Sequence, residues 1–111
     1  MMIKTKIKGQ QEIQRIINKI VKEYKPEKVI LFGSAAWGKI KPNSDFDLFI
    51  IKPSKKERRF RSTEVENILE DRKFPLDILV YTPKEVKDRL LIDDFFIKRI
   101  LSQGKVLYEK A

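Results

Sequence analysis

The sequence predicts an α/β or mixed α+β fold, in which one sheet is flanked by helices. Helical and strand-like hydrophobic patterns alternate along the chain, and turn residues separate them. Residues 45–52 are apolar almost throughout, which is typical of a strand covered on both faces. Because the chain has 111 residues and contains no linker, repeat or low-complexity segment, we expect one domain over residues 1–111.

The first elements are predicted from the spacing of apolar residues. Residues 12–24 carry isoleucines at helical spacing, and Pro26 ends this predicted helix. The run KVILFG, residues 28–33, predicts a strand, and SAAWGK, residues 34–39, predicts a turn that leads into a short helix. The run DFDLFIIK, residues 45–52, predicts the second strand.

Next comes a predicted helix followed by the third strand. Ser54 is predicted to N-cap a helix that runs through Arg72. Its buried side would consist of Val65, Ile68 and Leu69. The run FPLDILVY, residues 74–81, predicts a strand that contains Asp77. The pattern therefore repeats a strand, a helix and a strand.

Two helices and an edge strand complete the prediction. Residues 82–85, Thr-Pro-Lys-Glu, have the pattern of a capping box with proline at the first helical position, so a helix begins there. A last helix carries Phe96 and Ile100 and ends at Gly104. Residues 105–109, KVLYE, predict a short edge strand.

The composition limits the possible chemistry. The chain is 41% hydrophobic and 37% charged, and because its apolar residues fall in periodic segments we expect a folded protein. It contains no cysteine and no histidine, which excludes disulfides, thiolate chemistry and a histidine base or zinc ligand. Catalysis would therefore use carboxylates, lysines, hydroxyls or a hard cation. No segment has the length of a membrane span, and we expect a cytoplasmic protein.

The net charge of +9 is concentrated in one stretch. Residues 52–61 contain six lysines and arginines against Glu57, a net charge of +5. A solvated helix face and a patch that binds an anion or a partner explain this stretch equally well. Since Phe60 is the only aromatic residue among these charges, the stretch lacks the stacking residues of single-strand binders, and we do not expect nucleic acid as a direct substrate.

Three aspartates lie in the predicted strands. Asp45 and Asp47 are two residues apart, so their side chains share one face, about 7 Å apart along the strand. Asp77 has a similar place in the third strand. If the second and third strands are neighbours, three carboxylates meet on one surface and repel each other unless a cation lies between them. Carboxylate oxygens are ligands of Mg²⁺, which favours sites completed by substrate phosphates.

A Gly-Ser pair follows the first predicted strand. Gly33 would allow a close approach of the backbone, and Ser34 would add a hydroxyl to a phosphate-binding turn before a helix. A tight turn at Gly33 with Ser34 as an N-cap explains the same pair equally well. Ser34 is not a credible hydrolase nucleophile because no histidine is present to activate it. No G-K-[ST] follows the glycine, which excludes a P-loop.

Together these residues resemble a known pattern. Gly33-Ser34, ten intervening residues, the pair Asp45 and Asp47, and the later Asp77 resemble the nucleotidyltransferase superfamily related to DNA polymerase beta. The resemblance implies a mixed sheet of three to four strands flanked by helices. It also implies that Asp45 and Asp47 ligate two Mg²⁺ ions, and that Asp77 ligates one of them and helps to deprotonate the attacking hydroxyl. Gly33 and Ser34 would hold the triphosphate of ATP, from which AMP is transferred to a hydroxyl.

The short length and the runs LFGS, SDFDL and GKVLYE resemble the minimal nucleotidyltransferases, known as MNT or MntA-like proteins. That resemblance implies an antitoxin that adenylylates a HEPN-domain toxin. Ala35 and Trp37 depart from the pattern, because many relatives carry arginines there. The departure keeps open a second hypothesis, a non-catalytic subunit that neutralises a HEPN-type partner by contact.

Overall fold

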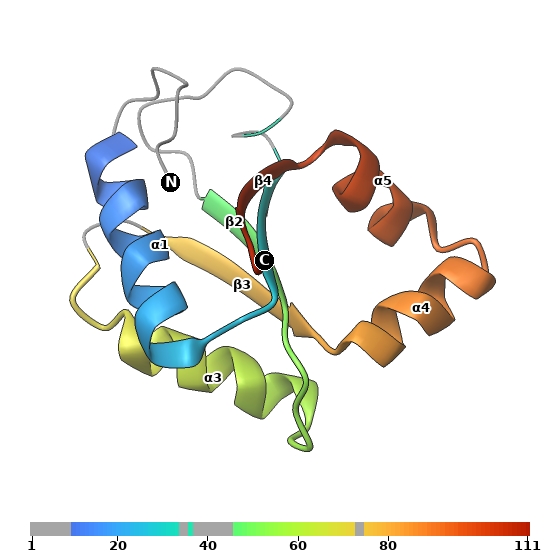
Figure 1. The fold of residues 1–111 in the computed structure, drawn as a ribbon, viewed down its shortest axis with the longest axis horizontal. Coiled ribbons are helices and arrows are strands. Elements are labelled where there is room, and N and C mark those ends of the chain that lie inside the picture. The colour runs from blue at the N-terminus through green and yellow to red at the C-terminus, as the bar shows by residue number, and fades with distance from the viewer. Residues whose placement is uncertain (1–9, 34–35, 37–45, 73–74) are drawn as a thin grey trace.

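The computed structural model describes residues 10–33, 36, 46–72 and 75–111. Its elements, in chain order, are α1 (Gln10–Tyr24), β1 (Lys28–Phe32), β2 (Phe46–Ile51), α3 (Arg58–Ile68), β3 (Leu76–Tyr81), α4 (Pro83–Leu91), α5 (Phe95–Gln103) and β4 (Lys105–Glu109). The strands form one sheet in the order β3-β2-β1-β4. β2 and β3 are parallel, whereas β1 is antiparallel to both of its neighbours, so the sheet is mixed, as predicted. Figure 1 shows α1 and α3 on one face of the sheet and α4 and α5 on the other.

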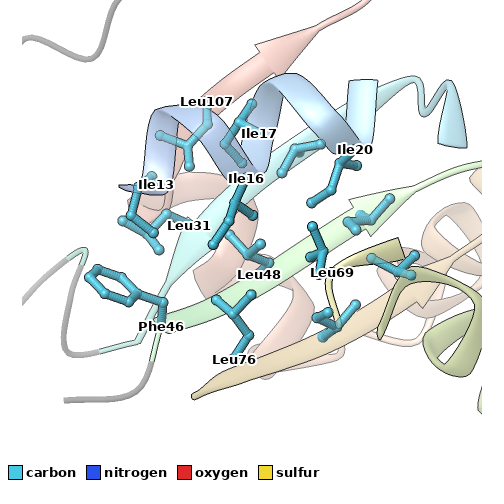
Figure 2. Close-up of a cluster of buried hydrophobic side chains, with 14 of the residues drawn as sticks. Ile13, Ile16, Ile17, Ile20, Leu31, Phe46, Leu48, Leu69, Leu76 and Leu107 are labelled. Carbon is cyan, nitrogen blue, oxygen red and sulfur yellow. The ribbon is translucent and has the colours of Figure 1, made fainter. Parts of the chain in front are cut away.

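The helix α1 buries its isoleucine stripe against the sheet. Ile16, Ile17 and Ile20 are at most 1% exposed. Figure 2 shows these side chains over Leu31 of β1 and Leu48 of β2. The helix ends before Pro26, as predicted, and the preceding Lys25 has a left-handed backbone with φ 54°. The spacing of the isoleucines thus correctly predicted both the helix and its buried face.

The strand β2 is covered on both faces. Leu48 belongs to the cluster under α1 and α3, whereas Phe49 belongs to the cluster under α4 and α5. Both side chains are fully buried. The continuous apolar run of the second strand is therefore explained by its central place in the sheet.

The prediction that Ser54 caps the following helix is wrong. The helix α3 begins at Arg58 with Glu57 at the N-cap. The Ser54 hydroxyl instead accepts a hydrogen bond of 3.1 Å from the Lys56 N–H, which closes a local turn before the helix. The helix also ends at Ile68 rather than at Arg72, and the Arg72 N–H donates to the Leu69 carbonyl in the turn that follows.

The two C-terminal helices begin where the sequence indicated. The Thr82 hydroxyl accepts from the Glu85 N–H at 3.1 Å, and the Glu85 carboxylate accepts from the Thr82 N–H at 2.8 Å, so the capping box is complete. Asp94 caps α5 by accepting from two backbone N–H groups. After Gly104 the chain enters β4, which pairs with β1 at the edge of the sheet, as predicted.

Several predictions fall outside the described residues. Of the short helix predicted over residues 34–39, only Ala36 is described, and its N–H donates to the Gly33 carbonyl at 3.0 Å. Ser34 and Asp45 are not among the described residues. Within the described ranges, no helix is both long and apolar enough to cross a membrane.

Candidate active site

Asp47 and Asp77 lie directly opposite each other in the sheet. The parallel pair β2 and β3 is in a register that aligns Asp47 with Asp77, one residue after each strand begins. Aligned residues of neighbouring strands share a face and are about 4.8 Å apart. Asp77 is exposed and Asp47 is partly exposed. The structure therefore brings two of the three predicted carboxylates together at the end of the sheet where β2 and β3 begin.

The two carboxylates face the side of the sheet that α4 and α5 cover. Side chains alternate along a strand, so Asp47 shares a face with Phe49, and Asp77 shares a face with Tyr81. Phe49 and Tyr81 pack together under α4 and α5, with ring centroids 5.1 Å apart. Asp47 and Asp77, which we call the acidic pair, thus lie on the same face of the sheet as this apolar cluster and next to its end.

Gly33 lies against the carboxylate of Asp47. Its φ is +77°, a left-handed conformation that favours glycine. A Cβ at this position would overlap Oδ2 of Asp47 and lie 3.1 Å from its Cγ. The preceding residue, Phe32, is aligned with Asp47 across β1 and β2. The sequence predicted a close backbone approach at Gly33, and among the described residues the group that it approaches is this carboxylate.

The donors at this end of the sheet fit a magnesium ion. Carboxylate oxygens are hard ligands, and Mg²⁺ sites commonly use one or two carboxylates completed by water and substrate phosphates. Because Gly33 has no Cβ, the Asp47 carboxylate can lie directly against the backbone at this position. No group of three or more metal-binding side chains occurs within the described ranges, from which Asp45 is missing. The metal-binding and phosphate-binding roles of Asp45, Asp47, Asp77, Gly33 and Ser34 stay predictions.

The basic stretch lies at the other end of β2. Lys52 follows the last residue of the strand, five residues and about 16 Å from Asp47 at the usual rise per residue. Its ammonium donates to the Tyr24 carbonyl and lies 4.3 Å from the centroid of the Tyr24 ring. Lys52 therefore holds the end of α1 and does not line the acidic pair.

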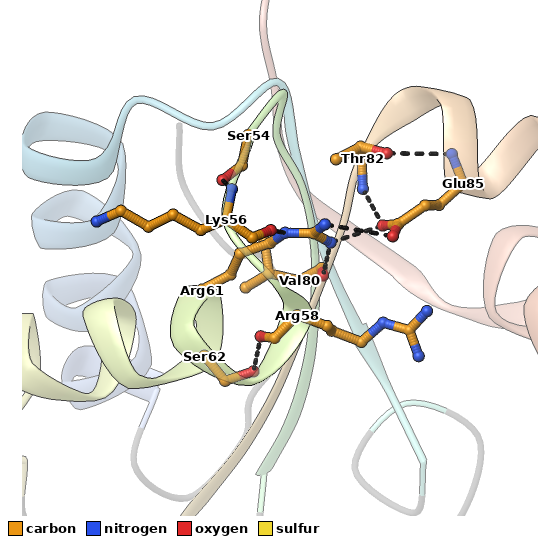
Figure 3. Close-up of polar contacts among 8 residues, drawn as sticks. All are labelled: Ser54, Lys56, Arg58, Arg61, Ser62, Val80, Thr82 and Glu85. Carbon is orange, nitrogen blue, oxygen red and sulfur yellow. Dashed lines mark hydrogen bonds and ion pairs between the residues drawn. The ribbon is translucent and has the colours of Figure 1, made fainter.

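Arg61, which the sequence presented as one more surface charge, is buried. Figure 3 shows its guanidinium between α3 and the start of α4. It donates to Glu85 at 2.6 Å, to the Val80 carbonyl at 3.1 Å and to the Lys56 carbonyl at 2.7 Å. Arg61 lies four residues before the buried Val65, so its helical spacing could have indicated its burial.

The carboxylate of Glu85 serves both the cap of α4 and this ion pair. Burial alone would raise the pKa of Glu85, but the hydrogen bonds from Arg61 and Thr82 and the nearby positive charges together lower it. The carboxylate is therefore ionised at neutral pH. It fixes the start of α4 relative to α3.

The family model for the polymerase beta nucleotidyltransferase domain matches residues 14–111. The chain belongs to this family. The matched residues include Gly33, Asp45, Asp47 and Asp77, and this polymerase beta nucleotidyltransferase has the mixed sheet that its sequence motifs implied. A comparison with curated proteins gives no match. Membership supports nucleotidyl transfer as the activity of the chain.

Proposed function

We propose that this nucleotidyltransferase transfers AMP from ATP to a hydroxyl of a partner protein in a magnesium-dependent reaction. The proposal rests on one observation above all, the in-register pair of Asp47 and Asp77 where β2 and β3 begin. Gly33 adds to it, because its backbone meets Asp47 without a side chain in between. Family membership supplies the reaction type.

Each residue has a defined part in the proposed reaction. Asp45, Asp47 and Asp77 would hold two Mg²⁺ ions, which would supply positive charge that stabilises the phosphates during transfer. Gly33 and Ser34 bind the triphosphate. The acceptor oxygen forms a bond to the α-phosphorus as the bond to the bridging oxygen breaks. Pyrophosphate leaves, and Asp77 takes up the hydroxyl proton.

The proposed partner is a HEPN-domain toxin, and the chain is its antitoxin in the cytoplasm. This part rests on the likeness of the runs LFGS, SDFDL and GKVLYE to MNT proteins. Ala35 and Trp37 favour a second candidate, a subunit that retains the fold and neutralises the partner by contact. In that case loss of the carboxylates would leave neutralisation intact.

Transfer of labelled AMP to the purified HEPN-domain partner tests the proposal. Asp47→Asn and Asp77→Asn should each reduce labelling at least ~100-fold, the scale of losing a group that stabilises transition-state charge. Asp71→Asn is the matched control, because Asp71 is exposed and pairs with Arg15 and Lys19 of α1, across the sheet from the acidic pair. Labelling by the double variant Asp47→Asn/Asp77→Asn at the wild-type rate would overturn the catalytic assignment.

Co-expression with the toxin separates the two candidates. If the proposed reaction neutralises the toxin, cells that carry Asp47→Asn should stop growing, whereas cells with Asp71→Asn should grow like wild type. Equal growth of the Asp47→Asn and wild-type strains would support neutralisation by contact.

A further inference from the structure

The turn between α4 and α5 exposes a run of apolar side chains. Five of the seven residues from 90 to 96 are large and apolar, and we refer to these five as the hairpin tip. They are Leu90, Leu91, Ile92, Phe95 and Phe96, with 37%, 75%, 67%, 82% and 49% of their surfaces exposed. Figure 1 shows the turn that carries them projecting away from the sheet.

The exposed area is large for a protein of this size. At ~200 Å² for each fully exposed side chain, the hairpin tip presents roughly 600 Å² of apolar surface. The largest apolar patch on a typical monomer is about 300–600 Å² and is often functional. One side of a standard protein–protein interface buries about 800 Å². The hairpin tip together with a polar rim can therefore supply one side of such an interface.

The hairpin tip is connected to the candidate active site. The ring of Phe96 stands edge-on to the ring of Phe32, with centroids 5.7 Å apart and an interplanar angle of 86°. Phe32 is in turn aligned with Asp47 across β1 and β2. A macromolecule seated on the hairpin tip would thus lie beside the acidic pair.

Three basic side chains of α4 and α5, those of Lys84, Arg89 and Lys98, pair with aspartates of the same helices or of the turn between them. Lys84 pairs with Asp88 at 2.8 Å, and Lys98 pairs with Asp93. These pairs neutralise most of the charge beside the hairpin tip, and Arg58 is the one residue of the basic stretch 52–61 that lines a cavity together with Ile92. A partner at the hairpin tip would therefore be recognised by apolar contact and shape, with a weak dependence on salt.

From this placement we propose that the hairpin tip is the docking surface for the acceptor protein. The occupant is a protein with an exposed apolar surface and with the acceptor hydroxyl at the edge of that surface, so that docking carries the hydroxyl toward Asp47 and Asp77. The inference rests on the proposed function for the identity of the acceptor. Docking itself is a separate property from transfer, and each can be measured without the other.

The test uses the full chain and the HEPN-domain partner as the probe. The double variant Leu91→Ser/Phe95→Ser removes the two most exposed members of the hairpin tip, whose contribution to the core is small. Phe60→Ser is the matched control, because Phe60 is 50% exposed on α3 and lies under Arg59 outside the hairpin tip. Binding is measured by titration calorimetry at 0.1 M and 0.5 M salt, together with AMP labelling and the binding of Mg²⁺–ATP.

The double variant should weaken binding of the probe at least ~30-fold, as expected for the loss of interface hot spots. Its KM for the probe should rise, while the affinity for Mg²⁺–ATP stays within about twofold of wild type. Phe60→Ser should bind like wild type, and raising the salt should change the affinity of wild type by less than about threefold.

Other results would overturn the inference or the proposed function separately. Wild-type affinity in the double variant, or no binding of the probe by wild type, overturns docking at the hairpin tip. A wild-type chain that dimerises by itself and becomes monomeric in the double variant also overturns it, because a second copy then occupies the surface. Binding that the double variant loses, without any AMP labelling by wild type, supports docking and refutes the transfer reaction.

Discussion

Replacing Gly33 by alanine should affect both the stability of the fold and the position of Asp47. The backbone of Gly33 has φ +77°, and an L-residue held in this region costs about 1–2 kcal/mol. The added Cβ would also overlap Oδ2 of Asp47 and press on its Cγ at 3.1 Å. Forcing an extra carbon into a packed position costs typically ~1–3 kcal/mol. We expect a total loss of about 2–5 kcal/mol in the free energy of unfolding.

A double-mutant cycle separates the two contributions. In an Asp47→Ala background the overlapping oxygen and the Cγ are absent, and the nearest remaining atom, the Asp47 Cβ, lies 3.5 Å away, an ordinary contact. Gly33→Ala should then cost only the backbone term of about 1–2 kcal/mol. The coupling between the two sites should therefore be about 1–3 kcal/mol.

Urea unfolding of the four proteins of this cycle measures that coupling. Equal costs of Gly33→Ala in both backgrounds would show that the alanine meets no obstacle at Asp47, and would refute the close approach. A cost below about 0.5 kcal/mol in both would also refute the left-handed backbone at Gly33. AMP labelling by Gly33→Ala at the wild-type rate would contradict the view that the position of Asp47 matters for transfer.

Two further predictions concern buried polar groups away from the acidic pair. Arg61→Met should lower the free energy of unfolding by about 3–5 kcal/mol at pH 7, because it leaves Glu85 without its partner. Since the pKa of Glu85 is lowered in the folded chain, this loss should shrink as the pH falls below about 4.3. Urea unfolding at several pH values measures the loss, and a loss that does not depend on pH would contradict the ion pair. Burial raises the pKa of Tyr24 to about 12, so the folded chain keeps a proton that the unfolded chain releases above about pH 10, and stability should fall by about 2–3 kcal/mol between pH 10 and 12. The variant Tyr24→Phe should lack this extra fall. At pH 7 it should be at least as stable as wild type, because the Tyr24 hydroxyl is buried without a hydrogen-bond partner among the described residues. The same dependence of the free energy of unfolding on pH in wild type and Tyr24→Phe would contradict this prediction.

Periodicity and turn chemistry predicted most elements because local rules decide them. The isoleucine spacing of α1 and the capping box before α4 need no tertiary information. Ser54 misled the prediction because a serine before a helix can cap it or close a turn, and here its hydroxyl takes the Lys56 N–H. Arg61 misled it because arginine is mostly exposed, and only tertiary packing supplies the partners that allow its burial.

For the candidate site, the sequence indicated candidate residues but did not establish which of them are neighbours. Strand alternation placed Asp77 on a definite face, but only the parallel pairing of β2 and β3 aligns it with Asp47. Nothing local to Gly33 indicates that the group beside it is the Asp47 carboxylate, since 13 residues separate them in the chain. The exposed hairpin tip was also missed, because its apolar residues fit the pattern of an ordinary amphipathic helix.

The parallel pairing of β2 and β3 has a consequence for how such a protein can diversify. The spacing of Asp47 and Asp77 is fixed by the ladder of backbone hydrogen bonds between β2 and the edge strand β3, with α3 in the connection between the two strands. The turn between α4 and α5 lies away from the β2–β3 ladder and does not support it (Figure 1). Substitutions there can therefore accumulate and change which macromolecule is recognised, while the reacting groups keep their geometry.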